Sequence, residues 1–258
     1  MDVDSNFIGV ESLEILKGAR ERFERALNSC CERAGCAVRR APAEHAGGKF
    51  RLCFPSVLGG TQNLEVDVNY VGRVPLLGEE RRTLSSSFFG EGCEAPCLAL
   101  DELAAGKFLA LLSRAAARDF YDAASMMRIA PDLPTRAGFR LAFVCQAAAS
   151  RTDFRMVKVI PQAPNVVEIR QKLLPLLRVD QDAPTLDPTG LAADLHKRLQ
   201  PALRRVLDWS SGEKAFLDGF LDRSEIDSRL LTKDPVLQER IQKQPMLLWK
   251  QQHLKDRR

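Results

Sequence analysis

The sequence predicts an α+β fold, with a mixed sheet and its helices in the first half of the chain and a helical region after it. Alternation of apolar and polar residues, the pattern of a half-buried strand, marks the first part of the chain and thins out beyond Pro131. After residue 131 the apolar residues recur with helical spacing, and prolines punctuate the connections. This change of pattern predicts two domains, 1–130 and 131–258.

The composition is that of a globular protein with an ordinary core. Of 258 residues, 45% are hydrophobic and 28% are charged. No apolar run approaches the roughly 18 residues of a membrane span, and the acidic N-terminus does not resemble a secretory signal. The seven cysteines are odd in number and scattered, so neither a disulfide framework nor a zinc site is predicted. We therefore expect a cytoplasmic protein that has no membrane partner.

The first predicted element is an amphipathic helix over residues 11–36. Leu16, Phe23 and Leu27 fall close to one helical face, whereas charged residues occupy the opposite face. Gly35 follows as a plausible terminator, because glycine readily adopts the left-handed conformation that ends many helices.

Two alternating segments, 49–54 and 63–70, predict adjacent antiparallel strands. Gly59 and Gly60 lie between them. A Gly-Gly-Thr segment can also back a triphosphate, but its position between two strands favours a hairpin turn.

A connecting loop is predicted at 73–77 and 85–87, followed by a short apolar strand at 97–100. Asp101 is predicted to cap a helix that runs to about residue 127, with Glu102 in its first turn. Beyond Pro131 the predicted helices are Gly138–Ala149, Val166–Leu177, Leu191–Asp208, Lys214–Leu221 and Pro235–Gln244.

Three aspartates form the first candidate site. Asp2 and Asp4 are two residues apart, so in a strand they share one face, and Asp67 lies within the strand 63–70. Carboxylate oxygens are the ligands that Mg²⁺ prefers, and such a cluster is typical of phosphoryl-transfer chemistry. The alternative interpretation is a solvated terminus and a solvent-facing strand residue.

A second candidate site contains Lys107, Arg114 and Arg118. On one continuous helix these cations fall within about 40° of one another, a stripe suited to phosphate oxygens. Asp119 would lie about 120° from Lys107, so it joins this site only if the helix breaks around residues 114–117. The alternative is a solvated basic face in which Arg118 pairs with Asp122.

The positive charge of the chain is concentrated at its C-terminal end. Residues 233–258 contain seven Lys or Arg against three Asp or Glu, a surplus of +4 that equals the formal net charge of the whole chain. Such a segment can contact a polyanion such as RNA, although a solvated helix end has the same composition.

Read in order, these segments resemble the AbiEii/AbiGii toxin family of nucleotidyltransferases. The resemblance covers essentially the whole chain, and the order of the motifs is more specific than any one of them. The segments that carry it are Asp2-Val-Asp-Ser-Asn-Phe-Ile-Gly9, Leu64-Glu-Val-Asp67-Val-Asn-Tyr70, Glu102–Lys107, Arg118-Asp119-Phe-Tyr-Asp122, Glu225–Thr232 and Pro245–Lys250.

The resemblance implies a nucleotidyltransferase-like mixed sheet and an Mg²⁺-dependent enzyme. Asp2 and Asp4 would bind the ion, and Asp67 would complete the metal site or act as a base. Lys107 would hold nucleotide phosphates together with the neighbouring Arg114 and Arg118, and Asp119 would orient the nucleotide or Lys107. The resemblance further implies an NTP donor, an RNA acceptor such as tRNA, a cognate antitoxin protein and a role in abortive infection, a form of phage defence.

The family's opening Gly-Gly-Ser/Thr element would precede Asp2 and is not in this sequence. The resemblance therefore implies an N-terminal truncation relative to the family. Two expectations follow: the natural protein is longer and active, or this chain is an inactive relative that acts only as a nucleotide- or partner-binding module.

Overall fold

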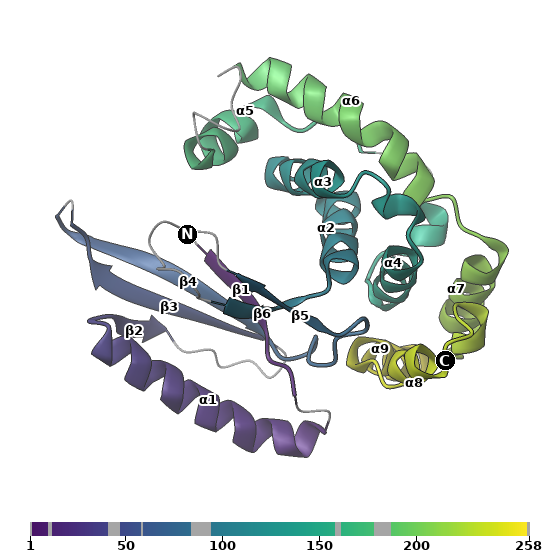
Figure 1. Ribbon diagram of the computed structural model, residues 1–258, viewed down its shortest axis with the longest axis horizontal. Coiled ribbons are helices and arrows are strands. Elements are labelled where there is room, and N and C mark those ends of the chain that lie inside the picture. Colours follow the sequence, from purple (N-terminus) through teal and green to yellow (C-terminus); the bar gives the residue numbers. More distant parts are fainter. Residues whose placement is uncertain are drawn as a thin grey trace. The chain divides into compact units, whose positions relative to one another are not determined.

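The computed structural model describes residues 2–9, 12–40, 47–57, 59–83, 94–157, 161–177 and 187–256. The chain forms two compact units, which are treated separately below (Figure 1). The sheet unit comprises Met1–Pro75 with Gln244–Met246, and the helical unit comprises Leu76–Lys243 with Leu247–Arg258.

The sheet unit contains one four-stranded mixed sheet and one long helix. The order of its strands is β1-β4-β3-β2; β1 is parallel to β4, and β3 is antiparallel to both of its neighbours. Its elements are β1 (Asp2–Asn6), α1 (Leu13–Arg33), β2 (Ala37–Arg40), β3 (Gly47–Pro55) and β4 (Thr61–Asn69).

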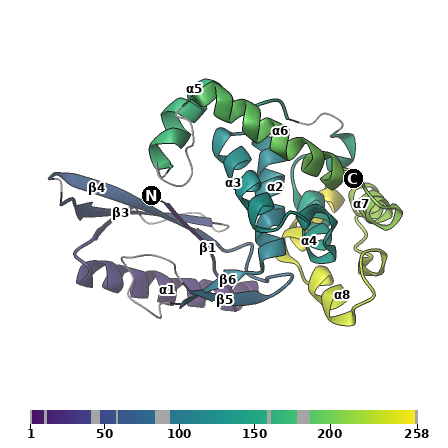
Figure 2. The same cartoon turned by 45° about the horizontal axis from the view of Figure 1, so that its top comes forward.

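Helix α1 lies along one face of this sheet, as two views of the chain show (Figures 1 and 2). Its apolar stripe packs on the strand residues that alternate toward it, so Phe50 and Val68 are almost fully buried. The Phe23 ring meets those of Phe7 and Phe50 edge to face, with centroids 5.4 and 6.4 Å apart. Burial of these apolar side chains holds the helix on the sheet.

The predictions for this part of the chain are confirmed. The helix ends at Arg33, and Gly35 follows in a left-handed conformation with φ of +69°. Strands β3 and β4 pair antiparallel through a turn in which Gly59 and Gly60 have φ of +88° and +73°. These two glycines therefore serve the hairpin, because side chains rarely tolerate positive φ.

The helical unit begins with a two-stranded antiparallel sheet and continues as packed helices. Its elements are β5 (Glu79–Thr83), β6 (Glu94–Leu98), α2 (Leu100–Arg114), α3 (Ala117–Ile129), α4 (Ala137–Ala149), α5 (Val166–Glu168), α6 (Pro188–Val206), α7 (Ser211–Arg223), α8 (Pro235–Gln242) and α9 (Pro245–Lys255), of which α9 begins among the residues grouped with the sheet unit. Among the described residues, no helix is long and apolar enough to cross a membrane.

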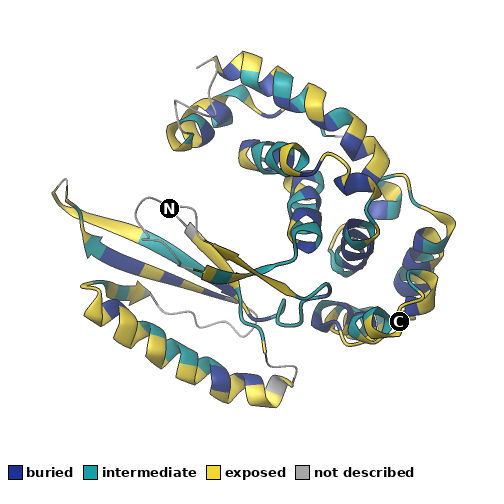
Figure 3. Cartoon of the chain, in the orientation of Figure 1, coloured by how far each residue is buried: buried dark blue, intermediate teal, exposed yellow. Residues whose placement is uncertain are grey.

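Small and aromatic residues build the core of the helical unit. Ala104, Ala105 and Ala142 are fully buried where α2 packs against α4, because small side chains let two helices approach closely. Phe108 and Phe139 fill the adjacent space edge to face, with ring centroids 5.4 Å apart. The burial pattern shows this core as the inward faces of the helices (Figure 3).

The division between the two units falls at residues 75 and 76, whereas the sequence placed a boundary near residue 130. Helices α2 and α3 precede residue 130, yet their buried residues belong to the same apolar cluster as those of α4 and α6. The change from strand to helix along the sequence therefore does not coincide with the change of core.

The structure also differs from the sequence at several elements. Asp101 does not cap α2, because the helix begins one residue earlier, and Asp101 pairs with Arg136 instead. The segment 166–177 is helical but divides into short α, π and 3-10 turns, ending at Pro175 and Leu176. Strands β2 and β5 and helix α9 were not predicted.

Candidate active site

The register of the sheet brings the predicted aspartates of the sheet unit together. Strand β1 runs parallel to β4, so that Asp4 lies opposite Asp67 and Asp2 opposite Glu65. Adjacent strands lie about 4.8 Å apart, and directly paired residues share one face. Asp4 and Asp67 therefore lie on the face that α1 does not cover; the side chain of Asp2 is outside the described part of the structure.

Strand β3 places one basic residue beside Asp67 and another beside Glu65. Lys49 pairs with Asp67 in the register, and its Nζ lies 3.5 Å from Asp67 Oδ2. Arg51 pairs with Glu65, and its Nη2 donates to Glu65 Oε1 at 2.6 Å. By strand register, the positions form two parallel rows: Lys49, Asp67 and Asp4, and Arg51, Glu65 and Asp2.

These carboxylates fit a divalent cation in ligand chemistry and in access. Asp4 is exposed, and the Asp67 side chain is 39% exposed, so a hydrated ion can reach both. Within the described side chains, no group of three or more Asp, Glu, His or Cys is placed to hold a metal. Asp4 and Asp67 therefore offer a pair of oxygen donors, as in sites where Mg²⁺ keeps waters and substrate phosphates as further ligands.

In the helical unit, the predicted helix is interrupted between residues 114 and 117. Such a break is the condition under which Asp119 was expected to join the site. Helix α2 ends at Arg114, Ala115 adopts a left-handed conformation with φ of +51°, and α3 starts at Ala117. The prediction of one continuous helix with a single cationic stripe is therefore wrong: Lys107 and Arg114 lie on α2, and Arg118 lies on α3.

Lys107 contacts an acid of α3 other than the predicted one. Its Nζ donates to Asp122 Oδ2 at 2.7 Å, and both side chains are about one-third exposed. Asp122 therefore holds the ammonium group in place, while the ammonium group, with three donors, keeps hydrogens for another ligand.

Asp119 holds the start of α3. It accepts two hydrogen bonds from Arg114, from Nε and Nη2, both at 2.7 Å, and a third from the Ala116 amide at 3.2 Å. Its side chain is only 2% exposed, whereas that of Arg114 is 54% exposed. Glu168 of α5 accepts from the next amide, Ala117, at 3.0 Å, so both carboxylates lie at the positive end of the helix dipole.

Arg118 is the most accessible of the predicted phosphate-binding cations. It is exposed on the first turn of α3, and no ion pair links it to another residue in the described ranges. The alternative pair between Arg118 and Asp122 is not formed, because Asp122 binds Lys107.

Several charged residues of these clusters were not predicted from the sequence. Glu65 and Lys49 share the strand face of Asp67, and the period-two alternation of both strands already places them there. Asp122 was considered only as a partner of Arg118. The helix break that brings it to Lys107 depends on a left-handed alanine, for which the sequence offers no glycine or asparagine signal.

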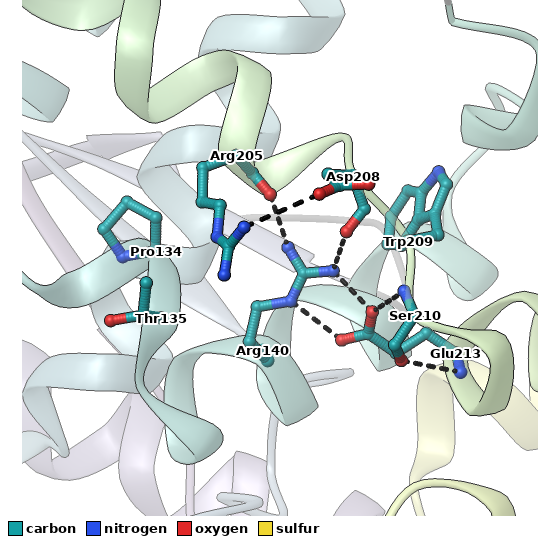
Figure 4. Close-up of a pocket in the computed structure, with 8 residues that line it drawn as sticks. All are labelled: Pro134, Thr135, Arg140, Arg205, Asp208, Trp209, Ser210 and Glu213. Atoms are coloured by element: carbon teal, nitrogen blue, oxygen red, sulfur yellow. Dashed lines mark hydrogen bonds and ion pairs between the residues drawn. The ribbon is translucent and has the colours of Figure 1, made fainter.

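A pocket of about 270 Å³ elsewhere in the helical unit is lined by residues that bind one another (Figure 4). Arg140 donates to both carboxylate oxygens of Glu213 and to the carbonyl oxygens of Arg205, Val206 and Asp208. All of its nitrogens are thus engaged in joining α4 to the end of α6 and the start of α7. This arginine holds the fold together and has no free donor for a ligand.

One protein family and one solved structure illustrate what this chain is similar to. The sequence model of the family described as "Nucleotidyl transferase AbiEii toxin, Type IV TA system" matches residues 1–239. No curated protein matches the chain. Among solved structures, MenT4, a nucleotidyltransferase toxin from Mycobacterium tuberculosis H37Rv, is similar over 83% of this chain and 67% of its own, with 15% identity and a TM-score of 0.42. The family match spans nearly the whole sequence, and the chain therefore belongs to the AbiEii family of nucleotidyltransferase toxins of type IV toxin–antitoxin systems.

Proposed function

We propose that this protein transfers a nucleotide from an NTP to an RNA acceptor in an Mg²⁺-dependent reaction. The observation that carries the proposal is the parallel pairing of β1 with β4, which sets Asp4 opposite Asp67 on an accessible sheet face. Two carboxylates on neighbouring strands are what a metal-assisted phosphoryl transfer requires of a protein. The membership of the chain in a nucleotidyltransferase family supports the same chemistry.

Asp4 and Asp67 would hold Mg²⁺, together with Asp2 as the resemblance implies. When bound, the ion neutralises phosphate charge and orients the phosphates for in-line displacement. Lys107 would bind phosphate oxygens through the hydrogens that Asp122 leaves free, and the exposed guanidinium groups of Arg114 and Arg118 would add to this.

Asp67 would also serve as a general base. Its carboxylate is partly exposed, so an acceptor hydroxyl can reach it, and the Lys49 Nζ lies 3.5 Å from its Oδ2. An ionised carboxylate can accept the proton of an attacking RNA hydroxyl, which then forms a bond to the α-phosphorus while the bond to pyrophosphate breaks.

The RNA acceptor, the antitoxin and the cellular location are inferred from charge and family membership. The positive surplus of residues 233–258 supports RNA as the acceptor, because cations attract the phosphate backbone. Membership in a toxin–antitoxin family supports a cognate antitoxin. NTP and tRNA are both cytoplasmic, and we place the protein there.

The test is label transfer from radiolabelled NTPs to total tRNA in the presence of Mg²⁺. The unaltered chain is expected to label RNA, and Asp67→Asn is expected to reduce the rate by about 10²–10⁴-fold. Glu21→Gln, which removes an exposed carboxylate on α1, is the matched control and should leave the rate unchanged. Equal rates for Asp67→Asn and the unaltered chain would sink the proposed active site.

One observation favours a second candidate, a nucleotide-binding module without catalysis. Glu65 and Asp67 already have cationic partners in Arg51 and Lys49, which balance the charge of these two carboxylates without a metal. In this case calorimetry would show NTP binding that is independent of Mg²⁺, and the chain would not label tRNA. Label transfer by the chain rules this candidate out.

A further inference from the structure

Helix α9 borders a second pocket of the helical unit, with a volume of about 430 Å³. Its lining combines an indole, three basic side chains and two aliphatic ones: Ala149, Arg151, Trp249, Lys250, His253 and Leu254. None of these lining residues is acidic. We call it the α9 pocket.

Trp249 is the unusual feature of this pocket. Its side chain is 54% exposed, although tryptophan is usually well buried in soluble proteins. The ring lies 4.0 Å from that of His253 between centroids, tilted by 37°, so the two rings form one aromatic platform. The histidine is itself fixed by a contact of 3.0 Å between its Nδ1 and the Trp249 carbonyl oxygen.

The basic side chains beside the two rings can still donate hydrogen bonds to an anion. Lys250 donates to the Ser150 carbonyl oxygen at 2.9 Å, which leaves two of its three hydrogens. It also lies within electrostatic reach of Asp153, but both oxygens of that carboxylate accept hydrogen bonds from Arg155. Arg151 is exposed, and within the described ranges no salt bridge engages it.

We propose that the α9 pocket binds one unstacked nucleotide of a single-stranded RNA. The base would stack on the Trp249–His253 platform, and the adjoining phosphates would contact Arg151 and Lys250. Aromatic platforms beside cations are the common means of holding single strands, since every base presents a π-face. The identity of the polymer as RNA rests on the proposed function.

Two observations favour a polymer over a free nucleotide or a protein partner. Lys255, exposed on the same helix beyond the pocket, extends the positive charge along α9, as a phosphate backbone requires and a mononucleotide does not. A protein partner would need complementary acidic groups for Arg151, Lys250 and Lys255, whereas one strand supplies both the base and the phosphates.

Fluorescence anisotropy with a labelled eight-nucleotide single-stranded RNA and the full chain tests the proposal. Trp249→Ala is expected to weaken binding at least about 5-fold, whereas Trp249→Phe retains most of the affinity. Leu248→Ala is the matched control, because Leu248 is an exposed neighbour on the same helix outside the pocket lining, and it should leave the Kd unchanged. Thermal unfolding of each variant verifies that it is folded. An unchanged Kd for Trp249→Ala overturns the proposal.

Charge reversal gives an independent measurement. Lys250→Glu should weaken RNA binding and reduce the slope of log K against log salt by about 0.7 or more, as loss of a phosphate contact on a single strand predicts. Lys197→Glu, an equal change of charge on an exposed residue of α6, is the control and should have the smaller effect. Equal effects of the two reversals overturn the proposal.

Competition and intrinsic fluorescence define the ligand. In a Trp209→Phe background, Trp249 is the remaining indole, and its emission should be quenched by the RNA oligomer. A mononucleotide or a duplex of equal length that competes as well as the oligomer overturns the assignment to a single strand. Specific capture of the antitoxin through Trp249, with RNA affinity unchanged, overturns it in favour of a protein site.

The outcome is separable from that of the proposed function. If Trp249→Ala weakens RNA binding while no form of the chain labels RNA, the α9 pocket stands and the transferase proposal fails. If label transfer occurs and Trp249→Ala changes neither the Kd nor the KM for RNA, the transferase proposal stands and the α9 pocket fails.

Discussion

Two candidate-site carboxylates of the sheet unit and two structural carboxylates of the helical unit are held in opposite ways. On the sheet, Asp4 is exposed, and Asp67 is 39% exposed beside one lysine at 3.5 Å. Among the helices, Asp119 and Glu213 are almost buried, and each accepts hydrogen bonds from an arginine and from a backbone amide of a helix start. The same chemical group is left open in one unit and saturated in the other.

This difference separates two uses of charge. A buried carboxylate whose oxygens are all engaged holds helices together and is costly to remove, because its partner is left without a counter-charge. A carboxylate on an open sheet face adds little to stability, since water and flexible lysines exchange freely around it. It is therefore the open carboxylates that remain available to a metal ion or a substrate.

The largest loss of stability is expected for Glu213→Ala. This change removes both contacts to Arg140, whose side chain is only 14% exposed, together with the acceptor of the Ser210 amide. We expect the free energy of unfolding to fall by about 3–5 kcal/mol in urea titrations. Asp194→Ala, which breaks an exposed pair with Arg198 on α6, is the control and should cost less than about 0.5 kcal/mol. Similar costs for the two variants would contradict the comparison.

Asp119→Ala should have the next largest effect on stability. It removes three hydrogen bonds at the start of α3, but the guanidinium group of Arg114 is half exposed and regains water. The expected cost is about 2 kcal/mol by chemical denaturation. Arg114→Ala should cost less than Asp119→Ala, because the Ala116 amide would keep its acceptor; the reverse order would contradict this role of Asp119.

Glu213 should also give the stability of the helical unit a dependence on acid. Burial alone would raise the pKa of Glu213, but hydrogen bonds from Arg140 and the Ser210 amide outweigh it and hold the pKa below the usual range. The group therefore contributes stability above its unfolded pKa of about 4.3, and this contribution is lost as the pH falls through the lower folded value.

The measurement is the free energy of unfolding of the unaltered chain and of Glu213→Gln between pH 3 and 7 (roughly the range over which a carboxyl group titrates). The difference between the two proteins should be greatest near neutral pH and should shrink in acid. A difference that grows as the pH falls would show that the sign is wrong.

A smaller effect is expected for Asp122→Asn, and on activity more than on stability. The pair with Lys107 is about one-third exposed on both sides, so its loss should cost under about 1 kcal/mol of stability. Loss of the contact frees the Lys107 ammonium group, and we expect a decrease of roughly 3–10-fold in the rate of label transfer, mainly through a higher KM for NTP. An Asp122→Glu variant should recover part of this loss; a variant with unchanged KM would argue against the positioning role.

The smallest change is expected for Glu65→Gln on the sheet. Its contact with Arg51 is short, at 2.6 Å, but both side chains are one-third to one-half exposed. The cost in unfolding free energy should be about 0.5 kcal/mol or less, and should vanish in high salt. A cost comparable to that of Asp119→Ala would remove the distinction between open and saturated carboxylates.

Much of the fold follows from local patterns along the chain. The amphipathic stripe of Leu16, Phe23 and Leu27 was enough to predict α1, and strict alternation was enough to predict β3, β4 and the Gly59–Gly60 turn. Strand β5 was not predicted, because its five residues, Glu79–Thr83, are all exposed and show no apolar alternation. Helix α9 was not predicted, because its apolar residues form no regular stripe along one helical face.

The candidate site was only half readable in the same way. Residue types and the order of motifs were enough to select Asp4, Asp67 and Lys107. The partner of Lys107 was not readable, since it depends on Ala115 adopting a left-handed conformation that local sequence does not favour.

Local sequence therefore reveals the chemical groups that the protein can use: which faces are apolar, where the acids and bases lie, and which family the motif order resembles. These are properties of a residue and its near neighbours, and short-range periodicity is enough to find them. Which of these charges have all their hydrogen bonds satisfied depends instead on the tertiary structure. The parallel register of β1 on β4 and the break between α2 and α3 join residues that are 63 and 15 positions apart in the chain, and such pairings depend on packing across elements that no local pattern specifies.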